Sequence, residues 1–447
     1  MKFYLESLGC PKNLVDAHGM TRLLAHLGHK PVEDLRRAEV IIVNTCGFVE
    51  DARAESLGEL RKLARKKRAG QVLIAADCLS QLWGDRLLVE VPGIDAVLST
   101  RRWSEIGSLV RDLQEGRGRR QRERMALLGD GLPAETRVAG AGPLAARQGA
   151  TAYLKIAEGC SAPCAFCTIP LIRGPAASRP AEEVVDEAAA LAAEGVREMI
   201  LIAQDTTAYG RDRGEVDALP GLLQSILAAA PDLDWLRLMY AYPGRVSSRL
   251  VEVMAGDPRV CRYLDLPLQH AHPDVLRRMK RPPDVERTRR LVEELRAAMP
   301  DVSLRTTFIV GYPGESEAEF QALLDFMAEM RFDRVGAFAY SPEEGTPAAE
   351  LPGAVPEEVK TERYERLMAL QQGISMEINQ AQVGRTLDVL VEGQGDGLSV
   401  GRSYRDAPEI DGMVILPGQV PVGSILPVSI TGAMEYDLLG QLAGEPG

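Results

Sequence analysis

The sequence predicts an α/β protein in three parts: an N-terminal doubly wound parallel sheet, a central partial (β/α)6 barrel of the TIM type, and a small C-terminal all-β barrel. Three observations support this. The first hundred residues alternate short apolar runs with helical patterns. The alternation resumes at residue 151 with six further strand candidates. Residues 385–447 contain only short strand patterns separated by Gly and Pro.

The N-terminal domain is expected to span residues 1–100. Its candidate strands are "KFYLES", "VIIVNT", "QVLIAAD" and "IDAVLS", and helical patterns cover Leu14–Leu27 and residues 50–69. Residues 101–149 lose this pattern, because "QEGRGRRQRERM" and "AGAGPLAARQGA" are rich in Arg, Gly and Ala. Such composition is typical of a linker, which we expect here.

The central domain is expected over residues 150–375. Its six strand candidates are "AYLKIA", "EMILIAQ", "WLRLMYA", "RYLDLPL", "LRTTFIV" and "RVGAFAY", separated by helical stretches such as "AEEVVDEAAALAAEG". Six consecutive βα units predict a barrel with fewer strands than the usual eight. A β domain is expected over residues 376–447, with the strands "TLDVLVEG", "LSVGRS", "GMVILP" and "SILPVSITG".

Composition restricts the class of protein. Hydrophobic residues make up 45% and charged residues 26% of the 447 positions, as in ordinary globular proteins. The sequence shows neither a signal-peptide pattern nor 18 consecutive apolar residues, so we expect a cytoplasmic protein without a membrane span. The formal net charge of −12 argues against nonspecific nucleic-acid binding and is compatible with a basic protein partner.

A cysteine triad follows the first strand of the expected barrel. In "CSAPCAFC" the thiols are Cys160, Cys164 and Cys167. Soft thiolates at close spacing select zinc or iron–sulfur clusters. A structural zinc site needs a further pair of ligands, and the sequence nearby has none. Three thiolates on a four-iron cluster leave one iron with an open coordination position, and the alternative is three unrelated core thiols, which rarely show this spacing.

Three other cysteines follow strands of the N-terminal sheet. Cys10, Cys46 and Cys78 each come after a strand candidate. Loops after parallel strands converge on one edge of a sheet, so these thiols can form a second three-thiolate site. The alternative is three buried free thiols, a common state of cysteine. Cys261 stands alone and is expected to be a small buried core residue.

Several motifs carry a resemblance to a known family. They are "SLGCPKNLVD", "VNTCGFV", "ADCLSQ", "KIAEGCSAPCAFCTIPLIRG", "AQDTTAYG", "LDLPLQHA" and "TFIVGYPGE". On these motifs nearly the whole chain resembles the methylthiotransferases of the radical S-adenosylmethionine (SAM) superfamily. The chain departs from the family pattern at Ala17-His18, where Ser-Glu is frequent, and at Ser161, where Asn is frequent. Neither departure removes a cysteine.

The resemblance implies a transferase with two [4Fe-4S] clusters, one on each cysteine triad, and SAM as cofactor. The open iron of the barrel cluster would bind SAM for cleavage to a 5′-deoxyadenosyl radical, and the N-terminal cluster would carry the sulfur. A second SAM would supply the methyl group. A low-potential electron donor and a sulfur donor are implied as partners.

The resemblance also suggests contacts to SAM. Phe166 would pack near the adenine, Gly195 and Glu198 would lie near the amino group, and Arg305 would help to hold the rest of SAM. Simple core packing is the alternative for Phe166, and the glycines could be ordinary turn residues.

Two branches of the family differ in substrate. One modifies the β-carbon of an aspartate in small-subunit ribosomal protein twelve, and the other modifies an adenosine in tRNA. The C-terminal domain resembles a TRAM domain, and residues 385–447 contain nine Asp and Glu against three Arg and no Lys, a balance of −6. An acidic surface suits a basic ribosomal protein and argues against direct reading of nucleic acid. A non-catalytic iron–sulfur carrier is the third possibility, although a carrier needs no complete SAM-binding barrel.

Overall fold

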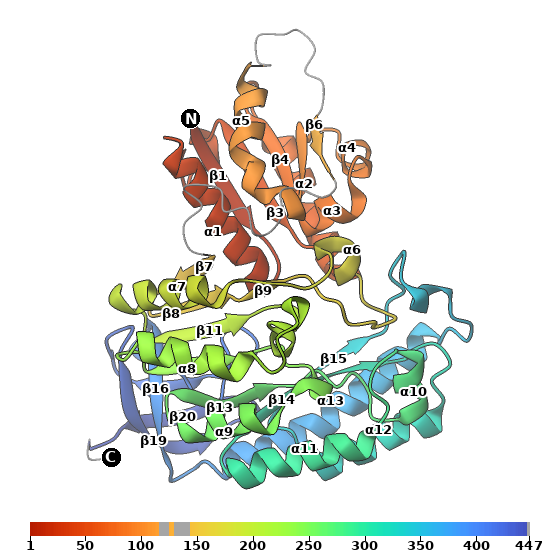
Figure 1. Ribbon diagram of the computed structural model, residues 1–447, viewed down its shortest axis with the longest axis vertical. Coiled ribbons are helices and arrows are strands. Elements are labelled where there is room, and N and C mark those ends of the chain that lie inside the picture. The colour runs from red at the N-terminus through yellow and green to blue at the C-terminus, as the bar shows by residue number, and fades with distance from the viewer. Residues whose placement is uncertain (116–124, 129–143, 445–447) are drawn as a thin grey trace.

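The protein consists of three bodies, and the N-terminal one lies at one end of the long axis (Figure 1). The computed structural model describes residues 1–115, 125–128 and 144–444. The N-terminal domain, in red and orange, lies above the central sheet, and the C-terminal strands, in blue, lie at its lower side. No helix in the described part of the chain has both the length and the apolar character needed to cross a membrane.

The N-terminal domain is a parallel sheet with the strand order β2-β1-β3-β4-β5-β6. Its strands are β1 (Lys2–Ser7), β2 (Lys30–Pro31), β3 (Val40–Thr45), β4 (Val72–Asp77), β5 (Ala96–Ser99) and β6 (Met125–Leu127). Helices α1 (Pro11–His26) and α5 (Ile106–Glu115) pack on one face of the sheet. Helices α2 (Glu50–Lys66), α3 (Cys78–Trp83) and α4 (Arg86–Glu90) pack on the other. Because both faces are covered, β3 and β4 are buried at every position. The predicted doubly wound sheet is confirmed.

Part of the stretch predicted as linker is folded, and its boundaries need correction. Ile106, Leu109 and Val110 of α5 repeat at helical spacing and are buried against the sheet. β6 pairs with β5, and β7 (Ala145–Gln148) pairs with the first strand of the central sheet. The short apolar repeat of α5 is hard to see beside the Arg- and Gly-rich run, which lies outside the described residues.

The central sheet has the order β15-β14-β13-β12-β11-β8-β7. Its six parallel strands are β8 (Thr151–Lys155), β11 (Glu198–Ile202), β12 (Trp235–Leu238), β13 (Val260–Asp265), β14 (Ser303–Val310) and β15 (Arg334–Ala339), with β7 antiparallel at one edge. Six parallel strands in sequence order are the partial barrel that the sequence predicts. A small ladder of β9 (Ala157–Glu158) and β10 (Ala177–Ser178) lies beside it.

Helices follow the strands of the central sheet. They are α6 (Ile169–Arg173), α7 (Ala181–Ala193), α8 (Leu219–Ala229), α9 (Ser248–Gly256), α10 (Pro273–Arg278), α11 (Val285–Ala298), α12 (Glu317–Met330) and α13 (Glu357–Gln380). Strand side chains alternate between two cores, as the period of a β-strand requires. The side chains of Met199 and Leu201 pack in the core between the sheet and the helices. Those of Ile200 and Ile202 face the barrel interior, where Cys261 is also buried.

The C-terminal domain is a closed barrel with the order β16-β17-β18-β20-β19. Its strands are β16 (Thr386–Gly395), β17 (Leu398–Ser403), β18 (Val414–Pro417), β19 (Ile425–Ala433) and β20 (Leu438–Leu442). The five-stranded barrel is therefore confirmed. The predicted boundary at residue 376 falls inside α13, which is continuous, and the β domain starts after this helix.

The β domain covers the amino end of the central barrel. Residues 402–411, at the end of β17 and in the connection to β18, contact the first residues of several barrel strands. Arg402 Nη2 lies 2.6 Å from Glu198 Oε2 at the start of β11, and Arg334 Nη2 at the start of β15 lies 2.6 Å from Asp406 Oδ1. All of these side chains are almost fully buried. The carboxyl end of the barrel therefore faces the N-terminal domain, and the amino end is closed.

Candidate active site

The three N-terminal cysteines meet at the carboxyl edge of their sheet. Cys10 caps the start of α1, Cys46 follows β3 and Cys78 follows β4. The Asn13 side-chain Oδ1 lies 3.3 Å from Cys10 Sγ and 3.7 Å from Cys78 Sγ. Gly9 adopts a left-handed φ of +91°, and a Cβ on it would lie 3.0 Å from Cys46 Sγ. The loops that carry the three thiols are therefore packed against one another, as a shared cluster requires.

A second glycine allows the same close approach. A Cβ on Gly47 would lie 2.9 Å from the backbone of Leu79, so any side chain would separate the loop of Cys46 from the loop of Cys78. The glycines beside the cysteines in "LGC" and "TCG" are therefore needed for the close packing of these loops.

The barrel triad lies in the loop between β9 and α6, at the carboxyl edge of the central sheet. Cys160 Sγ accepts a hydrogen bond from the Ala162 N–H at 3.4 Å, and Arg281 Nη1 lies 3.7 Å from Cys164 Sγ. The Cys167 N–H donates to the Cys164 carbonyl at 3.3 Å, which holds these two residues in one tight turn. All three cysteines are partly exposed.

Burial disfavours the charged form of most of these thiols. It raises the pKa of Cys46 and Cys160, raises that of Cys78 well above its ordinary value, and raises that of Cys167 to about 12. Thiolates at these positions need a cation to compensate the lost hydration, which a bound iron cluster provides. The donor set of three sulfurs at each place fits such a cluster.

Arg173 connects the barrel domain to the N-terminal triad, and sequence reasoning missed it. It ends α6, just after the barrel cysteines, and its side chain is 2% exposed. The guanidinium donates to Asp16 Oδ2 at 2.8 Å and Asp77 Oδ1 at 3.1 Å, and it lies 3.3 Å from Cys78 Sγ. One side chain of the barrel domain thus reaches the N-terminal triad, so the two sites face each other across the domain junction.

Lys12 is a second residue of the junction that sequence reasoning missed. It lies in "CPKN", two residues after Cys10, and extends to the barrel, where its Nζ is 2.9 Å from the centroid of the Tyr240 ring. Burial lowers the pKa of Lys12 to about 8, so the ammonium form still predominates at pH 7. The only sequence signal was a basic residue inside a cysteine motif.

The residues predicted to contact SAM fall at two opposite ends of the barrel. Phe166 lies at the carboxyl edge, packed against an apolar cluster that includes Tyr312 and Tyr340. Arg305 lies within the barrel on β14, where Asp265 Oδ1 is 2.9 Å and Asp411 Oδ1 is 3.4 Å from its guanidinium nitrogens.

Gly195 and Glu198 lie elsewhere. Gly195 follows α7, and Glu198 begins β11 at the amino edge, where it is paired with Arg237 and Arg402. We correct this expectation, because Glu198 lies at the end of the strand opposite to the cysteines and its carboxylate is enclosed by the β domain. Neither residue is included among the cofactor contacts proposed below.

Unsatisfied polar atoms at the carboxyl edge indicate room for a polar ligand. Gln204 Oε1, after β11, and Tyr340 Oη, after β15, are buried and have no hydrogen-bond partner among the described residues. Buried polar atoms are normally paired, so a ligand such as SAM would complete this edge. The barrel thus fits the cofactor where its cysteines lie.

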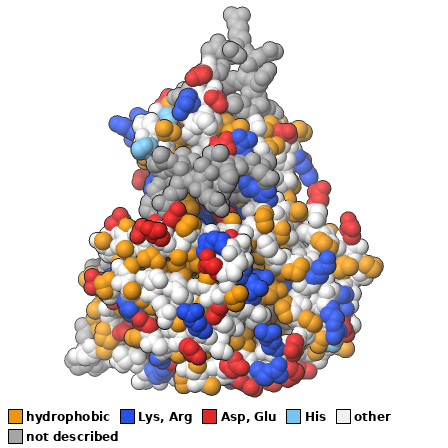
Figure 2. Space-filling model, in the orientation of Figure 1, with side chains coloured by type: hydrophobic (Ala, Val, Ile, Leu, Met, Phe, Trp, Pro, Cys, Tyr) orange, Lys and Arg blue, Asp and Glu red, His pale blue; other side chains and the backbone are white. Residues whose placement is uncertain are grey.

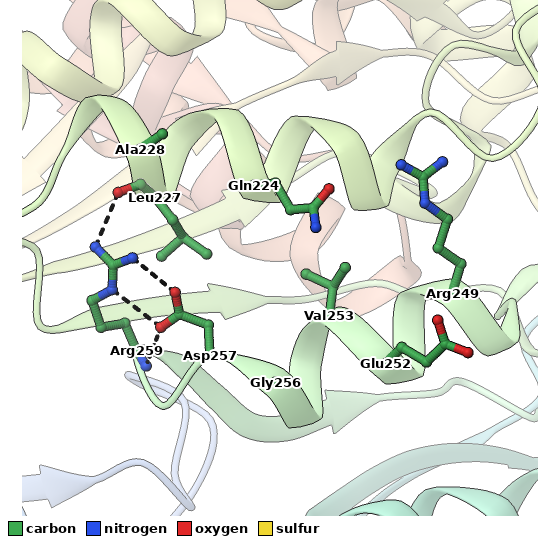
Figure 3. A pocket seen from close by; sticks show the side chains of 9 residues that line it. All are labelled: Gln224, Leu227, Ala228, Arg249, Glu252, Val253, Gly256, Asp257 and Arg259. Atoms are coloured by element: carbon green, nitrogen blue, oxygen red, sulfur yellow. Dashed lines mark hydrogen bonds and ion pairs between the residues drawn. The ribbon is translucent and has the colours of Figure 1, made fainter.

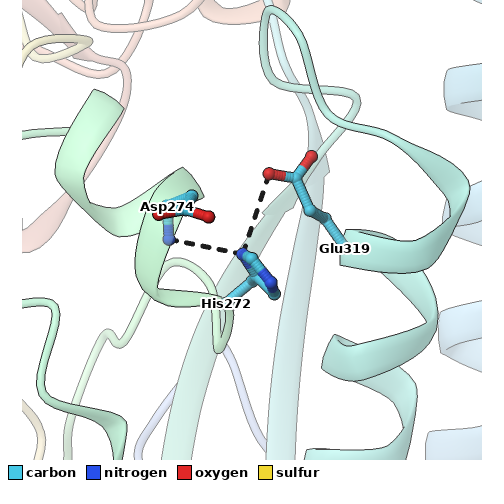
Figure 4. Close-up of side chains that lie close together, drawn as sticks. All are labelled: His272, Asp274 and Glu319. Atoms are coloured by element: carbon cyan, nitrogen blue, oxygen red, sulfur yellow. Dashed lines mark hydrogen bonds and ion pairs between the residues drawn. The ribbon is translucent and has the colours of Figure 1, made fainter.

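Two other features of the surface are separate from this site. A hollow between α8 and α9 contains Gln224, Arg249 and Glu252, and it lies on the outer side of the barrel helices (Figure 3). His272, Asp274 and Glu319 come close together (Figure 4), yet His272 caps α10 and Glu319 caps α12. Both arrangements are explained by the local structure of the helices.

Family models match three consecutive parts of the chain. A model described as "Uncharacterized protein family UPF0004" matches residues 2–99, the radical SAM superfamily model matches residues 154–327, and a TRAM domain model matches residues 383–443. These parts correspond to the three bodies of the fold.

Curated relatives match over the full length. The chain is 49% identical to the ribosomal protein uS12 methylthiotransferase RimO of Roseiflexus sp. (strain RS-1), with 100% of this chain and 98% of the relative covered. It is 50% identical to RimO of Chloroflexus aurantiacus, with 99% of each covered.

Solved structures share the fold at low identity. The radical SAM methyltransferase TsrM of Kitasatospora setae, solved with cobalamin and a [4Fe-4S] cluster, aligns with a TM-score of 0.58 at 16% identity, over 89% of this chain and 80% of TsrM. The cobalamin-dependent radical SAM enzyme OxsB aligns with a TM-score of 0.51 at 10% identity, over 83% of this chain and 56% of OxsB.

Proposed function

The chain belongs to the family of the ribosomal protein uS12 methylthiotransferases named RimO, and from this premise we propose that it transfers a methylthio group to the β-carbon of an aspartate in uS12. The observation that carries the proposal is that Arg173, which follows the barrel cysteines in the chain, reaches Cys78 of the N-terminal triad, so the loops of the two triads meet at one junction. A reaction that needs a radical at one site and a sulfur at the other requires both sites to reach the same substrate carbon.

SAM and [4Fe-4S] clusters are the cofactors of this chemistry. We assign one cluster to Cys10, Cys46 and Cys78 and the other to Cys160, Cys164 and Cys167. When bound, these groups supply the radical, the sulfur and the methyl group. The chain's own residues orient the groups and exclude water, with Phe166 and Arg305 as proposed contacts of SAM.

The surface of the β domain supports a protein substrate. Its exposed charges include Asp388, Glu392, Asp396 and Glu409, whereas Arg402 and Arg405 are buried in the contact with the barrel. Asp406 and Asp411 are buried in the same contact, so the exposed surface keeps the acidic balance of the composition, which favours a basic ribosomal protein. On the face drawn in Figure 2, acidic and basic side chains are interspersed, without a continuous basic field of the kind that binds RNA. Because the substrate is a ribosomal protein, we propose that the enzyme acts in the cytoplasm with a low-potential electron donor and a sulfur donor as partners.

An anaerobic reaction with purified protein tests the proposal. The reconstituted enzyme, SAM, a strong reductant and uS12 should yield uS12 with one methylthio group on an aspartate, detected by mass spectrometry of its peptides. Formation of 5′-deoxyadenosine shows that SAM is cleaved. A methylthio group on a tRNA adenosine instead of uS12 would identify the other family branch, and absence of both SAM cleavage and modified product would identify an iron–sulfur carrier.

A further inference from the structure

Lys12 is a buried cation without an anionic partner. The residue is 8% exposed, and no described carboxylate lies within ion-pair distance of its ammonium group. The buried Lys155 and Lys360, by contrast, are paired with carboxylates, 2.7 Å from Glu158 and 2.6 Å from Glu357. A buried charge is costly unless it is paired, so an unpaired ammonium at a domain junction indicates a site for an anion.

The residue that faces Lys12 is held in an unusual backbone conformation. Tyr240 has a φ of 60°, in the left-handed region that non-glycine residues rarely adopt. Its N–H donates to Asp265 Oδ2 at 3.2 Å, and its carbonyl accepts from the Thr206 N–H at 3.1 Å. Such strain is frequent at functional sites, where the surrounding structure maintains it. Here it presents the ring to the ammonium group, which gains a cation–π contact but remains without a counter-charge.

The position of Lys12 matches the place that the substrate must occupy. Lys12 leaves the loop of Cys10 and ends over Tyr240, which follows β12 at the carboxyl edge of the barrel. Under the proposed function, the substrate carbon lies between the two triads, because one supplies the radical and the other the sulfur. In aspartate, the carboxylate is bonded directly to that carbon. An adenine ring carries no anion at the corresponding place.

We propose that Lys12, held over the Tyr240 ring, binds the side-chain carboxylate of the substrate aspartate and so selects an acidic side chain over a neutral one. This proposal rests on the proposed function and gives Lys12 a role in substrate specificity.

The test compares two forms of uS12, one with the target aspartate and one with asparagine in its place. Binding to the reconstituted enzyme is measured for both forms with wild type, Lys12→Met and Lys12→Arg. Wild type should bind the asparagine form about 30-fold or more less tightly, since an uncompensated buried charge remains. Lys12→Met should bind both forms alike, and Lys12→Arg, which keeps the charge, should retain a preference for aspartate.

Lys360→Met is the matched control, because it removes a buried lysine that already has a partner. Its preference for aspartate should equal that of wild type. Equal binding of both uS12 forms by wild type would overturn the proposal. This comparison uses no enzyme variant, so it decides the question even where Lys12→Met does not fold. The proposal would also fail if Lys12→Met kept the preference while the electron paramagnetic resonance signal of the N-terminal cluster changed, which would make Lys12 a counter-ion of that cluster. Failure of wild type to modify uS12 at all would instead count against the proposed function.

Discussion

Arg173 and Glu198 are both buried charges, but they lie at opposite ends of the barrel and hold different domains in place. Arg173 binds the N-terminal domain through Asp16 and Asp77, whereas Glu198 binds the β domain through Arg402. Removing one partner of a buried ion pair leaves a charge in a medium that cannot solvate it. Both residues are thus expected to be sensitive to substitution for reasons of packing and charge.

Replacing Arg173 with Gln should lower the free energy of unfolding by about 3–5 kcal/mol, because the buried Asp77 loses its cation and the buried Asp16 keeps only Lys155. The measurement is denaturant-induced unfolding of the reconstituted protein. Arg197→Gln is a suitable control: its pair with Asp234 is more than 30% exposed on both sides, so we expect a cost below about 1 kcal/mol. Equal costs for the two variants would contradict the assignment of Arg173 to a buried network.

Glu198 should also make stability depend on acid pH. Burial alone would raise its pKa, but Arg402 and Arg237 outweigh burial and lower the pKa from 4.5 to about 2. A depressed folded-state pKa contributes stability that is fully present above pH 4.5 and is lost as the pH falls toward 2. In cluster-free protein, the free energy of unfolding of wild type should therefore exceed that of Glu198→Gln above pH 4.5, and this difference should disappear as the pH falls toward 2. A difference between the two proteins that stays constant from pH 6 to pH 2.5 would show that this carboxylate is not held ionised.

At the scale of elements, helix ends supply much of the local order around the barrel. The start of α12 is a capping box, in which the Ser316 hydroxyl accepts from the Glu319 N–H and the Glu319 carboxylate accepts from the Ser316 N–H. Glu319 also contacts Arg278 of α10 at 3.1 Å. The capping box thus satisfies N–H groups at the start of α12. The contact of Glu319 with Arg278 holds α12 against α10, which explains why His272, Asp274 and Glu319 lie close together.

Ser316→Ala should destabilise the protein by about 1 kcal/mol, because an N–H at the start of α12 loses its acceptor. Ser316→Asp keeps an acceptor and should cost much less. Denaturant unfolding at pH 7 distinguishes the two variants, and identical losses would mean that the hydroxyl is not an effective cap.

At the scale of the whole molecule, the barrel is closed from both ends by other domains. The side chain of Val15 from α1 enters the interior core from one end, and Leu390 and Ala407 of the β domain enter it from the other. Arg237, which is fully buried, has its charge compensated by Glu198 and donates to the Tyr404 carbonyl at 2.7 Å. The β domain is therefore part of the barrel's fold as well as a surface for a partner.

A chain that ends before β16 should fail to give soluble, cluster-loaded protein. Truncation exposes the interior core and leaves Arg237 and Arg334 without part of their partners. Expression of residues 1–382 with measurement of soluble yield and iron content checks this. A soluble truncated protein that still cleaves SAM would show that the β domain contributes only to substrate binding.

The two triads should be separable by mutation. We expect about eight irons per reconstituted chain, four for each cluster, and about four after all three cysteines of either triad are replaced by Ala. Without the N-terminal triad, SAM cleavage to 5′-deoxyadenosine should persist while methylthiolation of uS12 disappears. Detection of methylthiolated uS12 from a folded variant of that kind would rule out the role assigned to Cys10, Cys46 and Cys78.

The sequence by itself determined the three-part architecture and the two groups of cysteines, because both depend on local signals. Strand and helix periods mark the parallel sheets, and loops after parallel strands must meet at one edge, which brings Cys10, Cys46 and Cys78 together. Only the tertiary structure decided how these parts are docked. It placed Arg173 against Cys78, Lys12 over Tyr240, and Glu198 at the closed end of the barrel. Such pairings between domains have no periodic signature, since they depend on the orientation of rigid bodies whose contacting residues are far apart in the chain.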